Sequence, residues 1–192
     1  MFSNVAIQDI IFAHPKFVVL FNAFPSVLLM DSTYKTNRYG MPLFEMVGVS
    51  STNKTFNVAF AFISNEKEEN FTWAIQQCQS LLRSEGIGPK VTVTDRDSAF
   101  MNVVEAVFPD ASPLVCRFHV LKNVTSKCNS FCKTRDDDEM RHLDVVDSVV
   151  NSFEVVLDSQ TKESYVQAVV EFPQVCAKWP RFLNYGCVCF KV

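Results

Sequence analysis

Two aspartates in the sequence each follow a short apolar segment of the kind that forms a buried strand. Asp31 follows the run 27–30, and Asp95 follows the segment 91–93. If these strands are parallel neighbours, both carboxylates project into one crevice at the edge of the sheet. Carboxylates suit Mg²⁺ or Mn²⁺, and two such ions about 4 Å apart can activate an attacking oxygen and stabilise a leaving one at a phosphodiester. The alternative is that each aspartate is a cap or turn residue, the usual role of an isolated Asp after a strand.

A second candidate site is the segment in which two residues separate Cys116 from His119. This spacing can begin a zinc site, and Cys128 and Cys132 would complete four ligands. Structural zinc sites usually have two close ligand pairs in matching turns, whereas Cys128 falls on the apolar face of an expected helix. We therefore expect no zinc site. We expect the seven cysteines to be reduced thiols that mostly fill the core.

The elements that position these residues can be predicted from the hydrophobic periodicity. Three strands with short connections come first, and helices then alternate with strands. The first helix is expected to be capped by Ser64 or Asn65, and the second by Asp97 or Ser98. The order β-β-β-α-β-α-β-α over residues 25–135 predicts an α/β fold of the ribonuclease H-like class. The expected strands are 27–30, 43–51, 56–63, 91–93 and 114–116, and the apolar faces of the expected helices span 71–82, 100–107 and 121–131.

Charge is distributed unevenly along the 192 residues. Residues 1–135 hold 13 Lys and Arg against 11 Asp and Glu, whereas residues 136–192 hold 5 against 10. The change begins at the acidic run 136–139, which suits the solvated start of a helix. Beyond this run the apolar spacing predicts two helices and no strand, and Pro173 and Pro180 should break the chain after the second helix. We therefore expect a lead-in segment at 1–24, a core at 25–135 and an acidic helical extension at 136–192.

Two functional classes are disfavoured by composition. The chain has no run of about twenty apolar residues, and Asp9, His14 and Lys16 interrupt the N-terminal segment, so we expect neither a signal peptide nor a membrane partner. The formal net charge of −3 is also not the strongly basic balance that is typical of non-specific nucleic-acid binding.

Five motifs in a fixed order resemble the Mutator-like element (MULE) transposase domain. They also resemble the plant far-red-impaired-response proteins, which are domesticated relatives of that domain. The resemblance is close over residues 12–135 and weaker as far as residue 185. The last motif is similar to the family's Cys-x-x-His signature, with Cys116 and His119 as its two defining residues. The five motifs are the segments 27–43, 65–74, 93–99, 107–109 and 116–123.

The resemblance implies a DDE-type centre, in which three acids hold two metal ions for DNA cleavage and strand transfer. Asp31 would be the first acid and Asp95 the second, with Mg²⁺ or Mn²⁺ as the cofactor. Arg96, Lys122 and Lys127 would meet DNA phosphates. The implied partner is DNA, at transposon ends or promoters, and the implied location is the nucleus. A homo-oligomer is compatible with the resemblance, although no residue here specifies one.

The third acid of that family is a glutamate that follows a helical insertion, and no segment here resembles its motif. Neither the family's N-terminal zinc module nor its C-terminal zinc knuckle is recognisable. We therefore expect residues 136–192 to be the truncated start of the insertion, and the core to be inactive as it stands. The alternatives are a domesticated, non-catalytic DNA-associated regulator or dimerisation module, and an orphan fragment. The glutamates that lie in the expected insertion, to which we assign no catalytic role, are Glu139, Glu154, Glu163 and Glu171.

Overall fold

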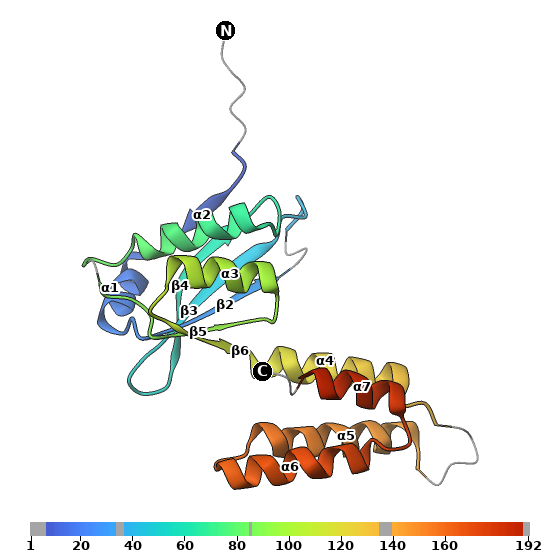
Figure 1. Ribbon diagram of the computed structural model, residues 1–192. Coiled ribbons are helices and arrows are strands. Elements are labelled where there is room, and N and C mark those ends of the chain that lie inside the picture. Colours follow the sequence, from blue (N-terminus) through green and yellow to red (C-terminus); the bar gives the residue numbers. More distant parts are fainter. Residues whose placement is uncertain (1–6, 34–36, 85, 135–139, 190–192) are drawn as a thin grey trace. The chain divides into compact units, whose positions relative to one another are not determined.

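In the computed structural model the chain forms two compact units, Met1–Cys116 and Arg117–Val192 (Figure 1). The structure describes residues 7–33, 37–84, 86–134 and 140–189, with side chains as far as residue 184. The division between the units falls before helix α4 (Arg117–Phe131), which the sequence analysis grouped with the core. The expected domain boundaries at residues 24 and 135 stay predictions.

The first unit is built on a six-stranded sheet. Its strands are β1 (Ile10–Phe12), β2 (Val27–Thr33), β3 (Leu43–Val49), β4 (Thr55–Phe62), β5 (Val91–Thr94) and β6 (Ser112–Val115). Their order is β1-β4-β3-β2-β5-β6, with β2, β3 and β4 antiparallel, β5 parallel to β2, and β6 parallel to β5. This is the ribonuclease H-like arrangement, so the predicted fold class is confirmed. Strand β1 extends the sheet beyond β4 and was not predicted.

Helices α2 (Glu68–Gln79) and α3 (Ser98–Val107) pack on one face of this sheet. A third helix, α1 (Pro15–Ala23), connects β1 to β2. The alternation along β3 turns Phe44 into the core, where its ring meets Phe71 of α2 and Phe100 of α3 edge-on, with centroid distances of 5.3 and 5.4 Å. Because edge-on aromatic contacts are favourable and directional, this trio aligns both helices against the sheet.

The prediction that Ser64 or Asn65 caps α2 is wrong. The helix begins after Lys67, which makes no side-chain capping bond. The N-terminal segment holds this region instead: the Ser64 N–H donates to Asp9 Oδ1 at 2.6 Å, and Asn70 Nδ2 donates to Asp9 Oδ2 at 3.0 Å. A carboxylate from the start of the chain thus stabilises the entry to α2, in place of a local cap.

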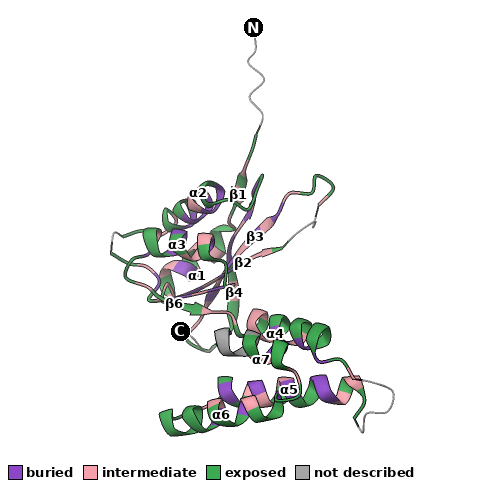
Figure 2. Ribbon diagram, turned by 45° about the vertical axis from the view of Figure 1, so that its right-hand side comes forward, coloured by how far each residue is buried: buried purple, intermediate pink, exposed green. Residues whose placement is uncertain are grey.

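The second unit consists of helices around their own buried core, which appears purple in Figure 2. After α4 the described chain forms α5 (His142–Leu157), α6 (Lys162–Val175) and α7 (Pro180–Cys189), one helix more than the two expected. Pro173 lies in the last turn of α6, and Pro180 begins α7, where a missing N–H costs little. The acidic run 136–139 lies outside the described residues. None of the described helices is both long and apolar enough to cross a membrane.

Gly48 of β3 lies opposite Phe56 of β4, and the Phe56 ring covers it. A Cβ atom added to Gly48 would lie 2.4 Å from Phe56 Cζ, closer than carbon atoms approach without a shift. The cross-strand ring therefore needs a glycine beneath it.

We predict that Gly48→Ala lowers the free energy of unfolding by about 1–3 kcal/mol, because the ring must move to admit the methyl group. Urea unfolding measures the change. Gly88→Ala is the matched control, since its nearest atoms would lie at 3.9 Å, an ordinary contact. The explanation requires that Phe56→Ala removes most of the Gly48→Ala penalty; an equal penalty in both backgrounds would contradict it.

Candidate metal centre

The candidate metal centre lies where β2 and β5 stop pairing. The parallel ladder ends at the pair Leu29 and Val93. Two residues further along each chain come Asp31 and Asp95, so the same register brings both onto one face of the sheet, on neighbouring strands about 4.8 Å apart. Both aspartates are partly buried. The prediction that the first strand ends at Asp31 is wrong, because β2 continues to Thr33 in its pairing with β3.

The residue after each aspartate helps to orient its carboxylate. The Ser32 N–H donates to Asp31 Oδ1 at 2.9 Å, and the Arg96 N–H donates to Asp95 Oδ1 at 2.6 Å. The two side chains are therefore held by equivalent local contacts at equivalent points of the sheet.

The start of α3 restrains the chain just beyond Asp95. Asp97 Oδ1 accepts a hydrogen bond from the Phe100 N–H at 2.8 Å, which confirms one of the two predicted caps. Arg96 lies exposed between the candidate ligand Asp95 and this cap. A cationic residue therefore directly follows Asp95 in the chain.

Glu45 is a third carboxylate on this face, and the sequence analysis missed it. In the antiparallel pairing of β2 and β3, Glu45 lies directly opposite Asp31. Like charges in such a pair repel, so this arrangement costs stability when nothing compensates it. The alternation of the strand 43–49, combined with a hairpin register, was the signal that would have found it.

Two neighbouring carboxylates supply only some of the ligands that a hard divalent cation needs. In the part of the chain that the structure describes, no group of three or more His, Cys, Asp or Glu side chains is arranged to hold a metal ion. Glu45 therefore does not complete a three-ligand set with Asp31 and Asp95. One or two carboxylates are nevertheless a common protein contribution to a Mg²⁺ site, in which waters and substrate phosphates supply the other ligands.

Comparison with known proteins adds a family to this geometry. The MULE transposase domain matches residues 27–123, a segment that contains both aspartates and about half of the chain. The chain belongs to the MULE transposase domain family.

The curated relatives that match this MULE chain are much longer proteins. It is 37% identical over 98 residues to the PKS-NRPS hybrid synthetase cheA of Chaetomium globosum, a match that covers 50% of this chain and 2% of that protein. It is 30% identical over 123 residues to Protein FAR1-RELATED SEQUENCE 5 of Arabidopsis thaliana, covering 64% of this chain and 15% of that protein. Protein FAR-RED IMPAIRED RESPONSE 1 of the same plant is 28% identical over 102 residues, which are 53% of this chain and 12% of that protein.

A solved structure also resembles the chain at a low level. It is the HTLV-2 integrase catalytic core domain in complex with magnesium, in a dimeric form. The likeness covers 77% of this chain and 84% of that chain, with 12% identity and a TM-score of 0.34.

The segment with Cys116 and His119, which the sequence analysis compared with a Cys-x-x-His signature, crosses the sequence boundary between the two units. Cys116 follows β6, and its N–H donates to Thr94 O at 2.7 Å, whereas His119 lies in the first turn of α4. Cys128 and Cys132 are buried in the core of the helical unit, and burial raises the pKa of both thiols. A raised pKa disfavours the thiolate that a metal ligand requires. Four of the five cysteines whose side chains the structure describes are buried, as core thiols should be.

The two lysines named above as possible phosphate contacts lie in the helical unit. Lys122 and Lys127 are both exposed on α4.

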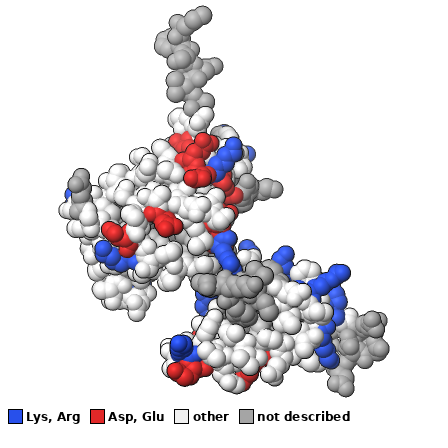
Figure 3. Space-filling view, viewed as in Figure 1, with Lys and Arg blue, Asp and Glu red and all other residues white. Residues whose placement is uncertain are grey.

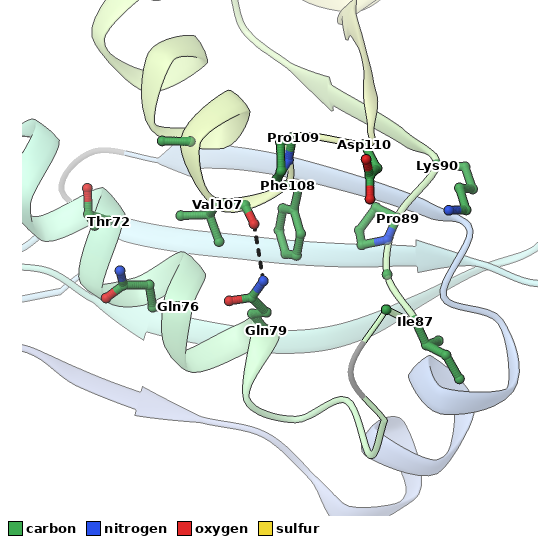
Figure 4. A pocket seen from close by; sticks show the side chains of 13 residues that line it. Thr72, Gln76, Gln79, Ile87, Pro89, Lys90, Val107, Phe108, Pro109 and Asp110 are labelled. Atoms are coloured by element: carbon green, nitrogen blue, oxygen red, sulfur yellow. Dashed lines mark hydrogen bonds between the residues drawn. The ribbon is translucent and has the colours of Figure 1, made fainter.

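A pocket lies elsewhere in the first unit. The pocket in Figure 4 is lined by the ends of α2 and α3 and the loop before β5, and Gln79 Nε2 donates to Val107 O there at 3.1 Å. It lies at the amino ends of β5 and β6, whereas Asp95 follows the carboxyl end of β5. The pocket is therefore not part of the candidate metal centre.

We predict that Glu45→Gln raises the free energy of unfolding by about 0.2–1 kcal/mol without metal, because it removes the cross-strand repulsion with Asp31. Urea unfolding in the presence of a chelator measures this. Glu105→Gln, at an exposed position of α3, loses the same charge and should change stability less. A Glu45→Gln protein no more stable than wild type would refute the repulsion.

Proposed function

We propose that the chain carries two acids of a MULE-type DDE centre, and that these bind Mg²⁺ or Mn²⁺ at DNA without cutting or transferring a strand by themselves. The main support is the register of β2 and β5, which brings Asp31 and Asp95 together from segments that are far apart in sequence. Membership of the MULE family supports the choice of DNA as the substrate class.

Asp31 and Asp95 would hold the cation, each through carboxylate oxygen. When bound, the cation would neutralise the two carboxylates, polarise a phosphodiester and lower the pKa of a bound water. The protein's own part is to keep the two carboxylates adjacent and oriented. The Ser32 and Arg96 N–H groups orient them, and the exposed Arg96 side chain would meet a phosphate.

We propose no catalytic role for the glutamates of the helical unit. Glu154 of α5 accepts a hydrogen bond from Arg117 at 3.2 Å within the helical unit. Glu163 and Glu171 lie on the exposed side of α6. These contacts suit structural or solvent-facing roles. Glu139 lies outside the described residues.

A non-catalytic DNA-associated regulator or dimerisation module is the second candidate function. The register of β2 and β5 supports this function as well. Asp31 and Asp95 would bind a cation that contacts DNA, without completing a two-metal reaction. Nuclear location and a DNA partner are part of both proposals and rest on the family.

We predict weak Mn²⁺ binding to the wild-type chain, which Asp31→Ala and Asp95→Ala each abolish because only one of the two proposed ligands remains. Titration calorimetry measures this. Asp110→Ala, at the pocket far from the pair, removes the same charge and should leave the titration unchanged. Identical titrations for wild type and Asp31→Ala would remove Asp31 from the site.

We also predict no strand transfer, and no cleavage above background, on a DNA-end substrate with Mn²⁺, because two acids do not supply the complete set. A gel assay with labelled DNA tests this. Robust cleavage that Asp95→Ala abolishes would overturn the proposed inactivity and favour a working enzyme.

A further inference from the structure

An exposed turn of the first unit carries a guanidinium and an aromatic ring in contact with each other. The turn precedes β3 and contains Arg38 and Tyr39. Arg38 Cζ lies 4.7 Å from the centroid of the Tyr39 ring, and Arg38 Nη2 donates a hydrogen bond to the Tyr39 hydroxyl oxygen. Tyr39 is nevertheless 72% exposed. Because Arg38 covers one face of the ring, the other face is the part that solvent reaches.

The side chain of Asn37 holds this turn in one shape. Its Oδ1 accepts hydrogen bonds from the N–H groups of Tyr39 at 3.0 Å and Met41 at 3.3 Å, and its Nδ2 donates to Met41 O at 2.6 Å. The Gly40 N–H donates to Asn37 O at 3.1 Å, and Gly40 has a φ of 68°, which glycine adopts without strain. Arg38 and Tyr39 are thus presented by an ordered turn, so a ligand that binds them pays little conformational entropy.

The turn lies at the end of the β2–β3 hairpin near Asp31. The last pair of this hairpin is formed by Thr33 and Leu43. It follows the pair of Asp31 and Glu45 by two residues on each strand. Because Tyr39 precedes Glu45 by six residues, the chain between them spans at most about 21 Å. This length is about six base steps of a duplex, so one DNA molecule can contact both the turn and the candidate metal centre.

The two side chains match the two parts of a nucleotide. A guanidinium binds a phosphate through charge-assisted hydrogen bonds, and it has five N–H donors, of which the Tyr39 hydroxyl uses one. No carboxylate among the residues that the structure describes forms an ion pair with Arg38. An exposed aromatic ring stacks on a base of any sequence. An acidic peptide would use the guanidinium but would have no comparable use for the open face of the ring.

The rest of the first unit gives such a local contact more weight. On the face of this unit that Figure 3 shows, the described acidic and basic side chains lie side by side. Mixed charge of this kind attracts a polyanion only weakly, because binding through phosphates depends on an excess of Lys and Arg. Contacts of the first unit with DNA therefore depend on individual, well-placed groups.

We propose that Arg38 and Tyr39 bind an unpaired nucleotide of the DNA that lies at Asp31 and Asp95. Arg38 contacts a phosphate, and the open face of Tyr39 stacks on the base. Both faces of a base inside a duplex are already stacked, and exposing one is costly, so the turn favours DNA with unpaired nucleotides. The inference rests on the proposed function for the choice of DNA, and it adds the form of DNA that this end of the sheet binds. It requires no metal ion.

The test is fluorescence anisotropy of the full chain in EDTA with two labelled DNA molecules. One is a blunt duplex of about twenty base pairs, and the other is the same duplex with a single-stranded extension of about five nucleotides. Tyr39→Ala should weaken binding to the extended duplex about tenfold and binding to the blunt duplex little, whereas Tyr39→Phe keeps the ring and should bind both as the wild type does. Tyr165→Ala is the matched control, because this tyrosine is 41% exposed on α6, away from the turn, and should change neither affinity.

Arg38→Ala tests the phosphate contact through its salt dependence. It should weaken binding and reduce the slope of log affinity against log salt concentration by about 0.7–0.9, for one lost contact. Arg181→Ala, at an exposed position of the helical unit, loses the same charge and should change the slope less.

Three results would overturn the proposal: a wild type without preference for the extended duplex, a Tyr39→Ala protein that keeps this preference, or equal losses for Tyr39→Ala and Tyr165→Ala. Because EDTA removes divalent cations, these results do not depend on the metal site. A chain that prefers the extended duplex but does not bind Mn²⁺ would refute the metal site alone. A chain that binds Mn²⁺ through Asp31 but does not prefer the extension would refute the nucleotide site alone.

Discussion

The parallel pairing of β2 and β5 is the contact on which the candidate centre depends. It joins segments that are distant in sequence and sets their register, so that the residues two positions beyond Leu29 and Val93 are both aspartates on the same face. Helix α2 makes this pairing possible, because β5 reaches the side of β2 only through a crossover over one face of the sheet. The ring contact of Phe44 with Phe71 holds that crossover against the sheet, and the contact of Phe44 with Phe100 does the same for α3.

Bringing acids together has an electrostatic cost. Asp31 lies beside Asp95 in one direction and opposite Glu45 in the other, on a partly buried face where screening is weaker than in bulk water. A sheet that needed only stability would not favour this arrangement, and a bound cation would offset its cost. The repulsion and the proposed metal site are thus two aspects of one arrangement.

Sequence periodicity predicted the three antiparallel strands β2, β3 and β4, the helices and strands that alternate after them, and the fold class, because these depend on local apolar spacing. It did not predict Glu45 as a neighbour of Asp31, since that contact depends on the register between two strands. The cap of α2 was missed for a similar reason: Asp9, from the start of the chain, takes the place of a local cap. Pro180 was interpreted as a break, although proline at the first position of a helix begins α7 without losing a bond. Long-range contacts account for the first two errors, and position within a helix for the third.

The most direct test of the central claim is a Mn²⁺ titration followed by amide NMR, since the paramagnetic ion broadens the signals of nearby nuclei. If Asp31 and Asp95 share one cation, the amides of Ser32 and Arg96 should broaden together at the lowest Mn²⁺ concentrations. The amide of Lys90, at the other end of β5, should broaden less at each concentration. Broadening of only one of the first two, or earlier broadening at the acidic run 136–139, would contradict a shared site.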